Sequence, residues 1–324
     1  MKIFVSRKIP DIGYRLLREA GVEFTAWGDD RMLTKEELIA HSLQHDGLIC
    51  MNGEKIDREF LNACRHLKVI SLYSVGYDNM DVAEATRLKI PLGNTPDVLS
   101  DATADIAFTL LLMTARKAIF HHKRILSNQW DFFRPTANLG IELKNKTLGI
   151  FGLGRIGLEM AKRCKGAYDM NIIYHNRSEN KEAGQLLKAK RLSFDELLRE
   201  SDIVSVHSAL TAETRGTFNY AVFAKMKPTA IFINTSRGSV HNEEDLIRAL
   251  NEKLIWGAGL DVTNPEPMSP ANPLLSMPNV TVLPHIGSAT EEARNGMARI
   301  AAENAIAGLR GGKLPHPINP EVYK

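Results

Sequence analysis

A glycine-rich segment in the middle of the chain has the spacing of a phosphate-binding loop. Gly152, Gly154 and Gly157 form the pattern G-x-G-x-x-G between an apolar run at residues 147–151 and a helical pattern at residues 158–164. In such a turn the first glycine permits the tight bend, the second lets the backbone approach a pyrophosphate, and the third allows close packing of helix on strand. The segment predicts a dinucleotide site at a helix N-terminus, with a plain glycine turn as the alternative.

The end of the next expected strand, residues 171–175, indicates which dinucleotide binds. A site for NAD normally has an acidic residue here to bind the ribose 2′-hydroxyl, but residues 172–178 contain none. Arg177 can pair with a 2′-phosphate through charge-assisted hydrogen bonds, and Asn176 and Ser178 can donate to it. We therefore expect NADP to be preferred. NAD stays possible, because Arg177 could instead be a solvated surface charge.

Three more residues follow expected strands and could together reduce a 2-keto acid. Arg237 follows residues 230–234, and a guanidinium binds a carboxylate through two parallel hydrogen bonds. His285 follows residues 280–283, and an imidazole can donate a proton near neutral pH. Glu266 could orient that imidazole and stabilise its charged form. Each has a structural alternative, respectively a loop salt bridge, a core histidine and an exposed turn residue.

The elements that must position these groups alternate between short apolar runs and helical patterns. Thr34 and Glu37 form a capping box at the start of one expected helix. We expect strands at residues 2–6, 23–27, 47–51, 69–74, 147–151, 171–175, 203–207, 230–234, 257–260 and 280–283, and helices at residues 12–20, 34–43, 158–164 and 291–309. This alternation predicts doubly wound parallel sheets.

One long helix is expected at residues 98–128. Its apolar face comprises Ile106, Leu110, Met113 and Ile119. A helix this long and apolar usually packs against more than one neighbour, so it could link two domains or line a subunit interface.

The length of 324 residues indicates two domains. Because the glycine loop lies in mid-chain, we expect a nested α/β architecture of two doubly wound parallel-sheet domains. A Rossmann dinucleotide-binding domain, residues 99–287, would be inserted into a flavodoxin-like substrate domain made of residues 1–98 and 288–324.

Composition narrows the class of protein further. The net charge is +3 and the charges are interspersed, so we expect neither a nucleic-acid nor a membrane partner. No stretch has the roughly 18–20 apolar residues of a membrane span, and the N-terminus does not read as a signal peptide. The three cysteines have no Cys-x-x-Cys spacing, so we expect buried thiols, no metal site and a cytoplasmic protein.

With the glycine loop, the motifs at residues 233–238, 265–267 and 284–290 resemble the D-isomer-specific 2-hydroxyacid dehydrogenase family over nearly the whole chain. Residues 95–99 and 259–263 are most similar to the glyoxylate/hydroxypyruvate reductases and the 2-ketogluconate reductases within that family. The resemblance implies NAD(P)H-dependent reduction of glyoxylate or hydroxypyruvate to the D-2-hydroxy acid. It also implies a homodimer formed through the cofactor domain.

The resemblance assigns a role to each matching residue. Arg237 would bind the substrate carboxylate and keto oxygen, His285 would be the acid/base, and Glu266 would be its partner. The backbone N–H groups of Val75 and Gly76 would bind the substrate carboxylate. Implied cofactor contacts, besides Asn176, Arg177 and Ser178, are Thr103, Gly152, Gly154, Arg155, Ile156, Gly157, Ser208, Ala209, Thr214, Thr235, Asp261 and Gly287.

Alternative functions remain open at this stage. A 2-ketogluconate or broad 2-keto acid reductase fits the same motifs, and Ala137 stands near where similar glyoxylate reductases carry a pocket-narrowing tryptophan. A co-repressor-like dinucleotide sensor is the non-enzyme alternative, against which Arg237, Glu266 and His285 argue. Glu266 also argues against formate dehydrogenases, which typically lack an acidic partner for their histidine.

Overall fold

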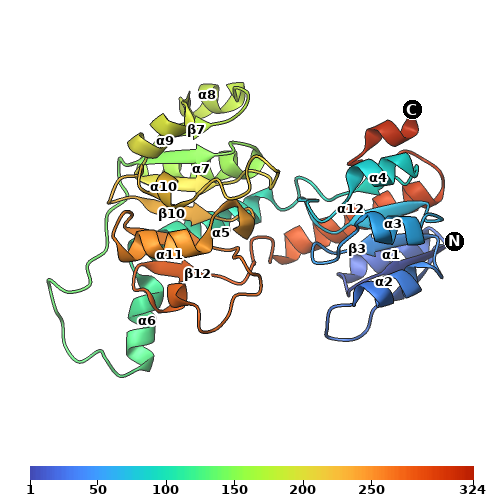
Figure 1. Ribbon diagram of the computed structural model, residues 1–324, viewed down its shortest axis with the longest axis horizontal. Coiled ribbons are helices and arrows are strands. Elements are labelled where there is room, and N and C mark those ends of the chain that lie inside the picture. The colour runs from blue at the N-terminus through green and yellow to red at the C-terminus, as the bar shows by residue number, and fades with distance from the viewer. The chain divides into compact units, whose positions relative to one another are not determined.

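The computed structural model describes residues 1–324, which fold into two compact units. The terminal unit comprises Met1–Leu99 and Ser288–Lys324, and the central unit comprises Ser100–Gly287. Each is an α/β unit around one parallel sheet, of five and seven strands respectively (Figure 1). The expected α/β fold of two nested, doubly wound parallel-sheet units is therefore confirmed.

The terminal unit has the strand order β2-β1-β3-β4-β5, which is the flavodoxin-like order. Its strands are β1 (Lys2–Val5), β2 (Glu23–Ala26), β3 (Gly47–Cys50), β4 (Val69–Leu72) and β5 (Leu92–Gly93). Its α-helices are α1 (Asp11–Glu19), α2 (Lys35–Ser42), α3 (Arg58–Ala63), α4 (Val82–Arg87) and α12 (Glu291–Leu309), and a 3₁₀ turn, η3 (Pro320–Tyr323), ends the chain.

Local signals set the helix boundaries of this unit. Gly21, with a φ of 69°, follows α1, because a left-handed residue terminates a helix at little cost when it is glycine. The expected capping box of α2 is present: Thr34 accepts a hydrogen bond from the N–H of Glu37, and the Glu37 side chain accepts one from the N–H of Thr34. These two helices begin and end within one residue of their expected limits.

The central unit has the strand order β12-β11-β10-β9-β6-β7-β8, which is the Rossmann order extended by one strand. Its strands are β6 (Thr147–Phe151), β7 (Asn171–His175), β8 (Lys190–Arg191), β9 (Ile203–Val206), β10 (Ile231–Asn234), β11 (Gly257–Leu260) and β12 (Val280–Val282). Its helices are α5 (Ser100–Ala115), α6 (Ala118–Leu126), α7 (Arg155–Tyr168), α8 (Lys181–Leu187), α9 (Phe194–Glu200), α10 (Tyr220–Phe223) and α11 (Glu243–Asn251), with 3₁₀ turns η1 (Gly238–Val240) and η2 (Pro273–Ser276).

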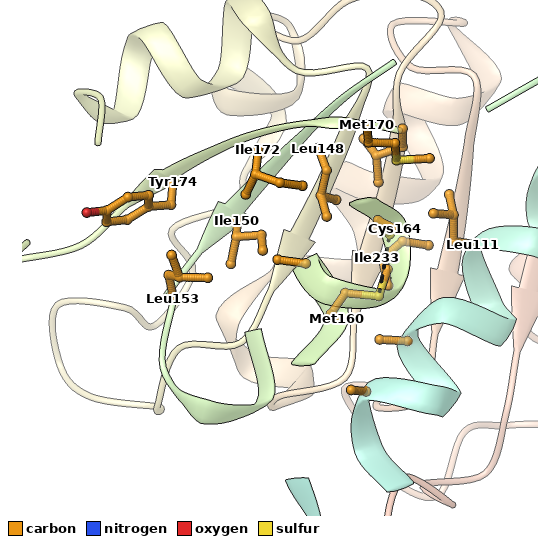
Figure 2. Close-up of a cluster of buried hydrophobic side chains, with 14 of the residues drawn as sticks. Leu111, Leu148, Ile150, Leu153, Met160, Cys164, Met170, Ile172, Tyr174 and Ile233 are labelled. Atoms are coloured by element: carbon orange, nitrogen blue, oxygen red, sulfur yellow. Dashed lines mark hydrogen bonds between the residues drawn. The ribbon is translucent and has the colours of Figure 1, made fainter. Parts of the chain in front are cut away.

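Alternate residues of the central strands point into two separate cores. On one face of the sheet, Ile150 and Ile233 pack with side chains of α5 and α7 (Figure 2). On the other face, Val204 and Phe232 pack with side chains of α9, α10 and α11. Both faces are covered, so these strands are continuous apolar runs and not alternating patterns.

The single long helix expected at residues 98–128 is wrong. The segment forms α5 and α6, separated at Lys117, which has a left-handed φ of 52°. In a continuous helix the carbonyl of Ala115 would accept a hydrogen bond from the N–H four residues later. It instead accepts one from the N–H of Ile141 (2.9 Å). The segment around Ile141 thus takes the hydrogen bond that would continue α5 beyond Ala115. A contact between residues so far apart in sequence cannot be predicted from hydrophobic periodicity.

Two simpler expectations can also be compared with the structure. Cys50, Cys64 and Cys164 are all buried free thiols, as expected. None of the helices is both long enough and apolar enough to cross a bilayer.

Candidate active site

The glycine loop between β6 and α7 combines one tight turn with one open position. Gly152 has a φ of 93°, and a Cβ there would lie 2.6 Å from the backbone nitrogen of Ser208. A Cβ on Gly157 would lie 3.0 Å from the carbonyl oxygen of Gly152. A Cβ on Gly154 would meet no protein atom within 4 Å. The first and third glycines are therefore required by the fold, whereas the second leaves space for a ligand.

The N-terminus of α7 opens at the same place. Gly154 is its N-cap and supplies no side-chain hydrogen bond to the first turn. Arg155 begins the helix and is exposed, while Ile156 is half-buried against the core. Backbone N–H groups and the positive end of a 14-residue helix thus adjoin the open side of Gly154. These residues fit the pyrophosphate of a dinucleotide.

The residues after β7 take different positions from one another. The Asn176 amide binds the glycine loop: its Oδ1 accepts from the N–H of Leu153 (2.6 Å) and its Nδ2 donates to the Leu153 carbonyl (3.1 Å). Arg177 and Ser178 are exposed. Arg191 of β8 donates to the carbonyls of Asn176 (3.0 Å) and Arg177 (2.7 Å). Asn176 therefore braces the loop, and a second arginine, missed in the sequence, lies beside Arg177.

The loop after β9 carries Ser208, Ala209 and Thr214. Ser208 lies against Gly152, as the close approach of its backbone shows. The Thr214 hydroxyl donates to the carbonyl of Ala209 (2.7 Å) and accepts from the N–H of Thr211 (2.8 Å). Thr214 thus holds together the loop after β9, which lies beside the glycine turn.

The expected pair of His285 and Glu266 is formed. Nδ1 of His285 and Oε1 of Glu266 lie 2.5 Å apart, and both side chains are partly exposed. Burial opposes ionisation of Glu266, but the hydrogen bond to His285 and the nearby charges of His285 and Arg237 outweigh it and hold the pKa of Glu266 below its ordinary value. With Nδ1 bound to the carboxylate, Nε2 is the imidazole nitrogen left to face a substrate.

Asp261, the residue after β11, fixes the backbone that carries His285. Its carboxylate accepts hydrogen bonds from the N–H groups of Ile286 and Gly287, each at 2.8 Å, and its carbonyl accepts from the N–H of His285 (2.8 Å). His285 has a left-handed φ of 52°, a conformation that costs energy for a non-glycine residue unless its surroundings enforce it. Burial raises the pKa of the Asp261 carboxyl, and the hydrogen bond from Ile286 partly offsets this.

Arg237 follows β10 in a loop that presses against the segment leading to Glu266. A Cβ on Gly238 would lie 1.8 Å from the carbonyl oxygen of Thr263, so only glycine fits there. The half-buried Arg237 side chain donates to the carbonyl of Ser236 (2.9 Å). Since the charge of Arg237 also lowers the pKa of Glu266, guanidinium, carboxylate and imidazole form one electrostatic cluster.

The segment that carries Glu266 is tied down by residues that the sequence did not single out. Glu243, at the start of α11, accepts from the N–H of Asn264 (3.1 Å) and from the side chain of Asn272 (2.6 Å). The hydroxyl of Thr263 donates to the carbonyl of Pro265 (2.8 Å). Only the acidic run of Glu243, Glu244 and Asp245, which begins α11, could have indicated Glu243, and such acids usually serve the helix dipole alone.

The remaining candidate residues fall into both units. Thr103 of α5 lies beside Gly287, since a Cβ on that glycine would be 3.2 Å from Cγ2 of Thr103. The hydroxyl oxygen of the buried Thr235 lies 3.4 Å from Nδ1 of His207. Val75 and Gly76 belong to the terminal unit, in the loop after β4, where the carbonyl of Val75 accepts from the side chain of Asn94 (2.8 Å).

Comparison with known proteins identifies the class that this fold and site define. Residues 108–287 match the family model described as "D-isomer specific 2-hydroxyacid dehydrogenase, NAD binding domain". The chain therefore belongs to the D-isomer-specific 2-hydroxyacid dehydrogenase family, and it is an NAD(P)-dependent oxidoreductase.

Individual relatives resemble the chain over its whole length. The glyoxylate reductase of Thermococcus litoralis is 43% identical over 325 residues, which cover 99% of this chain and 97% of the relative. The crystal structure of a glyoxylate reductase from Paecilomyes thermophila has a TM-score of 0.88 at 33% identity, covering 99% and 98% of the two chains. An NADPH-dependent glyoxylate/hydroxypyruvate reductase from Sinorhizobium meliloti, solved with NADP and malonate, has a TM-score of 0.86 at 31% identity, covering 99% and 97%.

Two glycine substitutions should separate ligand binding from folding. We expect Gly154→Ala to leave the thermal unfolding midpoint nearly unchanged and to weaken NADPH binding about tenfold or more, because its Cβ enters only the ligand space. Gly152→Ala should destabilise the protein by about 1–3 kcal/mol, because it combines a positive φ with a backbone clash. Fluorescence titration and thermal unfolding measure the two effects. A stable Gly154→Ala variant that binds NADPH normally would contradict this placement of the pyrophosphate.

Proposed function

We propose that the protein reduces glyoxylate or hydroxypyruvate to the corresponding D-2-hydroxy acid. The observation that carries this proposal is the hydrogen bond between His285 and Glu266, formed within the electrostatic reach of Arg237. The names of the relatives support the same substrates, since both glyoxylate reductases and a glyoxylate/hydroxypyruvate reductase match nearly the full chain.

Each residue of the cluster has one task in this reaction. Arg237 binds the substrate carboxylate and the keto oxygen, because its planar guanidinium offers paired donors. Within the terminal unit, the N–H groups of Val75 and Gly76 are the groups that we propose for binding a substrate carboxylate. Nε2 of His285 donates a proton to the oxygen as negative charge develops on it, and Glu266 stabilises the imidazolium that precedes this transfer. The bound nicotinamide supplies the hydride.

The central unit is the dinucleotide-binding domain in this proposal. Gly154, Arg155 and Ile156 hold the pyrophosphate at the start of α7, and Thr103 lies near the phosphates. Asp261 acts on the nicotinamide side through the loop that it braces, and Thr235 lines that side. Ser208, Ala209 and Thr214 form the wall next to the glycine turn. The terminal unit is the substrate domain.

Substitution of the acid/base pair tests the mechanism. We expect His285→Ala to lower kcat for glyoxylate by about 10²- to 10⁴-fold while the dissociation constant for NADPH stays within about twofold. Glu266→Gln keeps a hydrogen-bonding group but loses the charge that favours imidazolium. The alkaline limb of the kcat/KM profile for reduction should therefore move to lower pH. Steady-state kinetics from pH 5 to 9 measure both effects.

The matched control is His316→Ala. It removes a half-buried histidine of the terminal unit that lies outside the glycine loop and outside the cluster of Arg237, Glu266 and His285. This variant should keep its activity. Retention of glyoxylate and hydroxypyruvate reduction by His285→Ala would sink the proposed mechanism. A panel that includes pyruvate and 2-ketogluconate shows whether the pocket also accepts other keto acids.

We also propose that NADP is preferred over NAD. The exposed side chains of Arg177 and Ser178 lie one and two residues beyond Asn176, and no acidic residue occupies residues 172–178. Arg177 contributes to the lowered pKa of Glu213, after the larger effect of the hydrogen bond from Thr211. The charge of Arg177, two residues beyond the end of β7, therefore reaches Glu213.

Removal of the Arg177 charge tests cofactor choice. A charge-assisted hydrogen bond contributes about 1.5–3 kcal/mol, so Arg177→Ala should lower the ratio of kcat/KM for NADPH to that for NADH by about 10- to 100-fold. Arg199→Ala removes another exposed arginine, from α9, and should leave the ratio unchanged. An unchanged ratio in Arg177→Ala would disprove its role in cofactor choice.

We propose that the protein forms a homodimer through the arm, defined as α6 and the following residues to 140. No residue of α6 is buried, and Figure 1 shows the arm extending away from the rest of the central unit. Large apolar side chains on the arm are exposed: Ile125, Leu126, Trp130, Phe132, Phe133 and Leu139. Six such side chains in 15 residues require a partner surface to cover them.

The oligomeric state tests this assignment. Sedimentation velocity should give a dimer for the wild-type protein and a monomer for Phe133→Asp, because the side chain of Phe133 is 84% exposed and a charge would be buried at the interface. Leu186→Asp is the matched control, since Leu186 is 59% exposed on α8, away from the arm in sequence. A monomeric wild-type protein, or a dimer that survives Phe133→Asp, would refute the arm as the interface.

A further inference from the structure

Asn234 is a fully buried amide whose hydrogen bonds all serve the loop that carries Arg237. Its Oδ1 accepts from the N–H (3.0 Å) and the hydroxyl (2.9 Å) of Ser236. Its Nδ2 donates to the carbonyl of Arg237 (2.9 Å) and to Nδ1 of His241 (3.0 Å). An asparagine side chain has two acceptor sites and two donors, so its hydrogen-bonding capacity is used completely within seven residues of chain.

His241 completes this arrangement from the other end of the loop. The residue is 1% exposed, and its backbone N–H donates to the carbonyl of Gly238 (3.0 Å). Its ring stands edge-on to Phe232, with centroids 5.9 Å apart. Burial lowers the pKa of His241 to about 4, so the ring is neutral at neutral pH and its Nδ1 can accept the hydrogen bond from Asn234.

The loop is also confined on its outer side. Asn234 is the last residue of β10 and is in register with Val206 of β9 and Leu260 of β11, so its backbone is part of the sheet. The turn at Gly238 lies against the carbonyl of Thr263. The backbone of Arg237 is therefore held between a sheet strand, a buried amide and a neighbouring loop.

We propose that Asn234 and His241 are positioning residues that set the backbone of Arg237, and thereby aim its guanidinium, for the carboxylate of a 2-keto acid. This inference rests on the proposed function. Neither side chain touches the substrate, and both act only through Arg237. Loss of the amide would leave the Ser236 N–H without its partner and the Arg237 carbonyl with only the N–H of Val240 (3.2 Å), and the loop would shift to restore these hydrogen bonds.

A double-mutant cycle tests whether Asn234 acts through Arg237. A displacement of about 1 Å in a substrate-orienting group costs about 10²-fold in rate, so we expect Asn234→Ala to lower kcat/KM for glyoxylate by that factor. In the Arg237→Ala background the same substitution should change kcat/KM by less than about threefold, since the group it positions is already absent. The dissociation constant for NADPH, measured by fluorescence, should stay within about twofold of wild type throughout.

Variants at His241 supply the conservative comparison. His241→Asn keeps an acceptor near the place of Nδ1, whereas His241→Leu removes it. We expect His241→Asn to retain most of the wild-type kcat/KM and His241→Leu to resemble Asn234→Ala. Asn319→Ala is the matched structural control, because Asn319 is also fully buried and bonds to Leu92 (2.8 Å) and Ile90 (3.0 Å) in the terminal unit. Asn319→Ala should lower the stability of the protein. Its effect on kcat/KM should be the same in the wild-type and Arg237→Ala backgrounds.

The outcomes separate this inference from the function on which it rests. A wild-type enzyme that reduces neither glyoxylate nor hydroxypyruvate overturns the proposed function and the inference with it. If the wild type is active and Arg237→Ala is strongly impaired, the inference alone falls when Asn234→Ala costs the same factor in both backgrounds, or less than about threefold in the wild type.

Discussion

The constraint on which the site depends is that all strands of the central sheet run parallel. In such a sheet every strand ends at the same edge, so loops as far apart in sequence as those of Gly152 and His285 meet there. The glycine turn follows β6, the loop of Arg237 follows β10, and Asp261 and His285 follow β11 and β12. The chemistry therefore requires no continuous motif, because strand order brings the groups together.

Three polar side chains, of which Asn234 and Asp261 are buried and Asn176 is half-buried, then hold the loops in defined positions. Asp261 binds the backbone around His285, Asn234 binds the backbone around Arg237, and Asn176 binds the glycine turn at Leu153. A buried polar group that is fully hydrogen-bonded allows few alternative arrangements, because each one would leave a donor or acceptor without a partner. The three cases are alike. In each, a side chain at or just beyond the end of a strand forms hydrogen bonds with the backbone of a loop that carries a candidate site residue.

Ionisable residues at the same edge of the sheet have pKa values shifted in different directions. The hydrogen bond to His285 outweighs partial desolvation and lowers the pKa of the partly exposed Glu266, while burial raises the pKa of Asp261. His241 is kept neutral by burial and can therefore accept a hydrogen bond behind Arg237. The pKa values of the two carboxylates are thus shifted in opposite directions within one small region, because solvation and hydrogen bonding differ at each position.

The sequence by itself determined the alternation of strands and helices apart from the short strands β5 and β8, the tight turn at Gly152 and the candidates Arg237, Glu266 and His285, because these depend on local spacing and residue type. Only the tertiary structure divided the helix at Lys117, where the N–H of Ile141 takes the carbonyl of Ala115. It also assigned the Asn176 amide to the glycine loop and brought His285 and Glu266, which were expected as partners, within hydrogen-bonding distance. Those outcomes depend on which distant groups compete for one donor or acceptor, and that competition exists only in the folded chain.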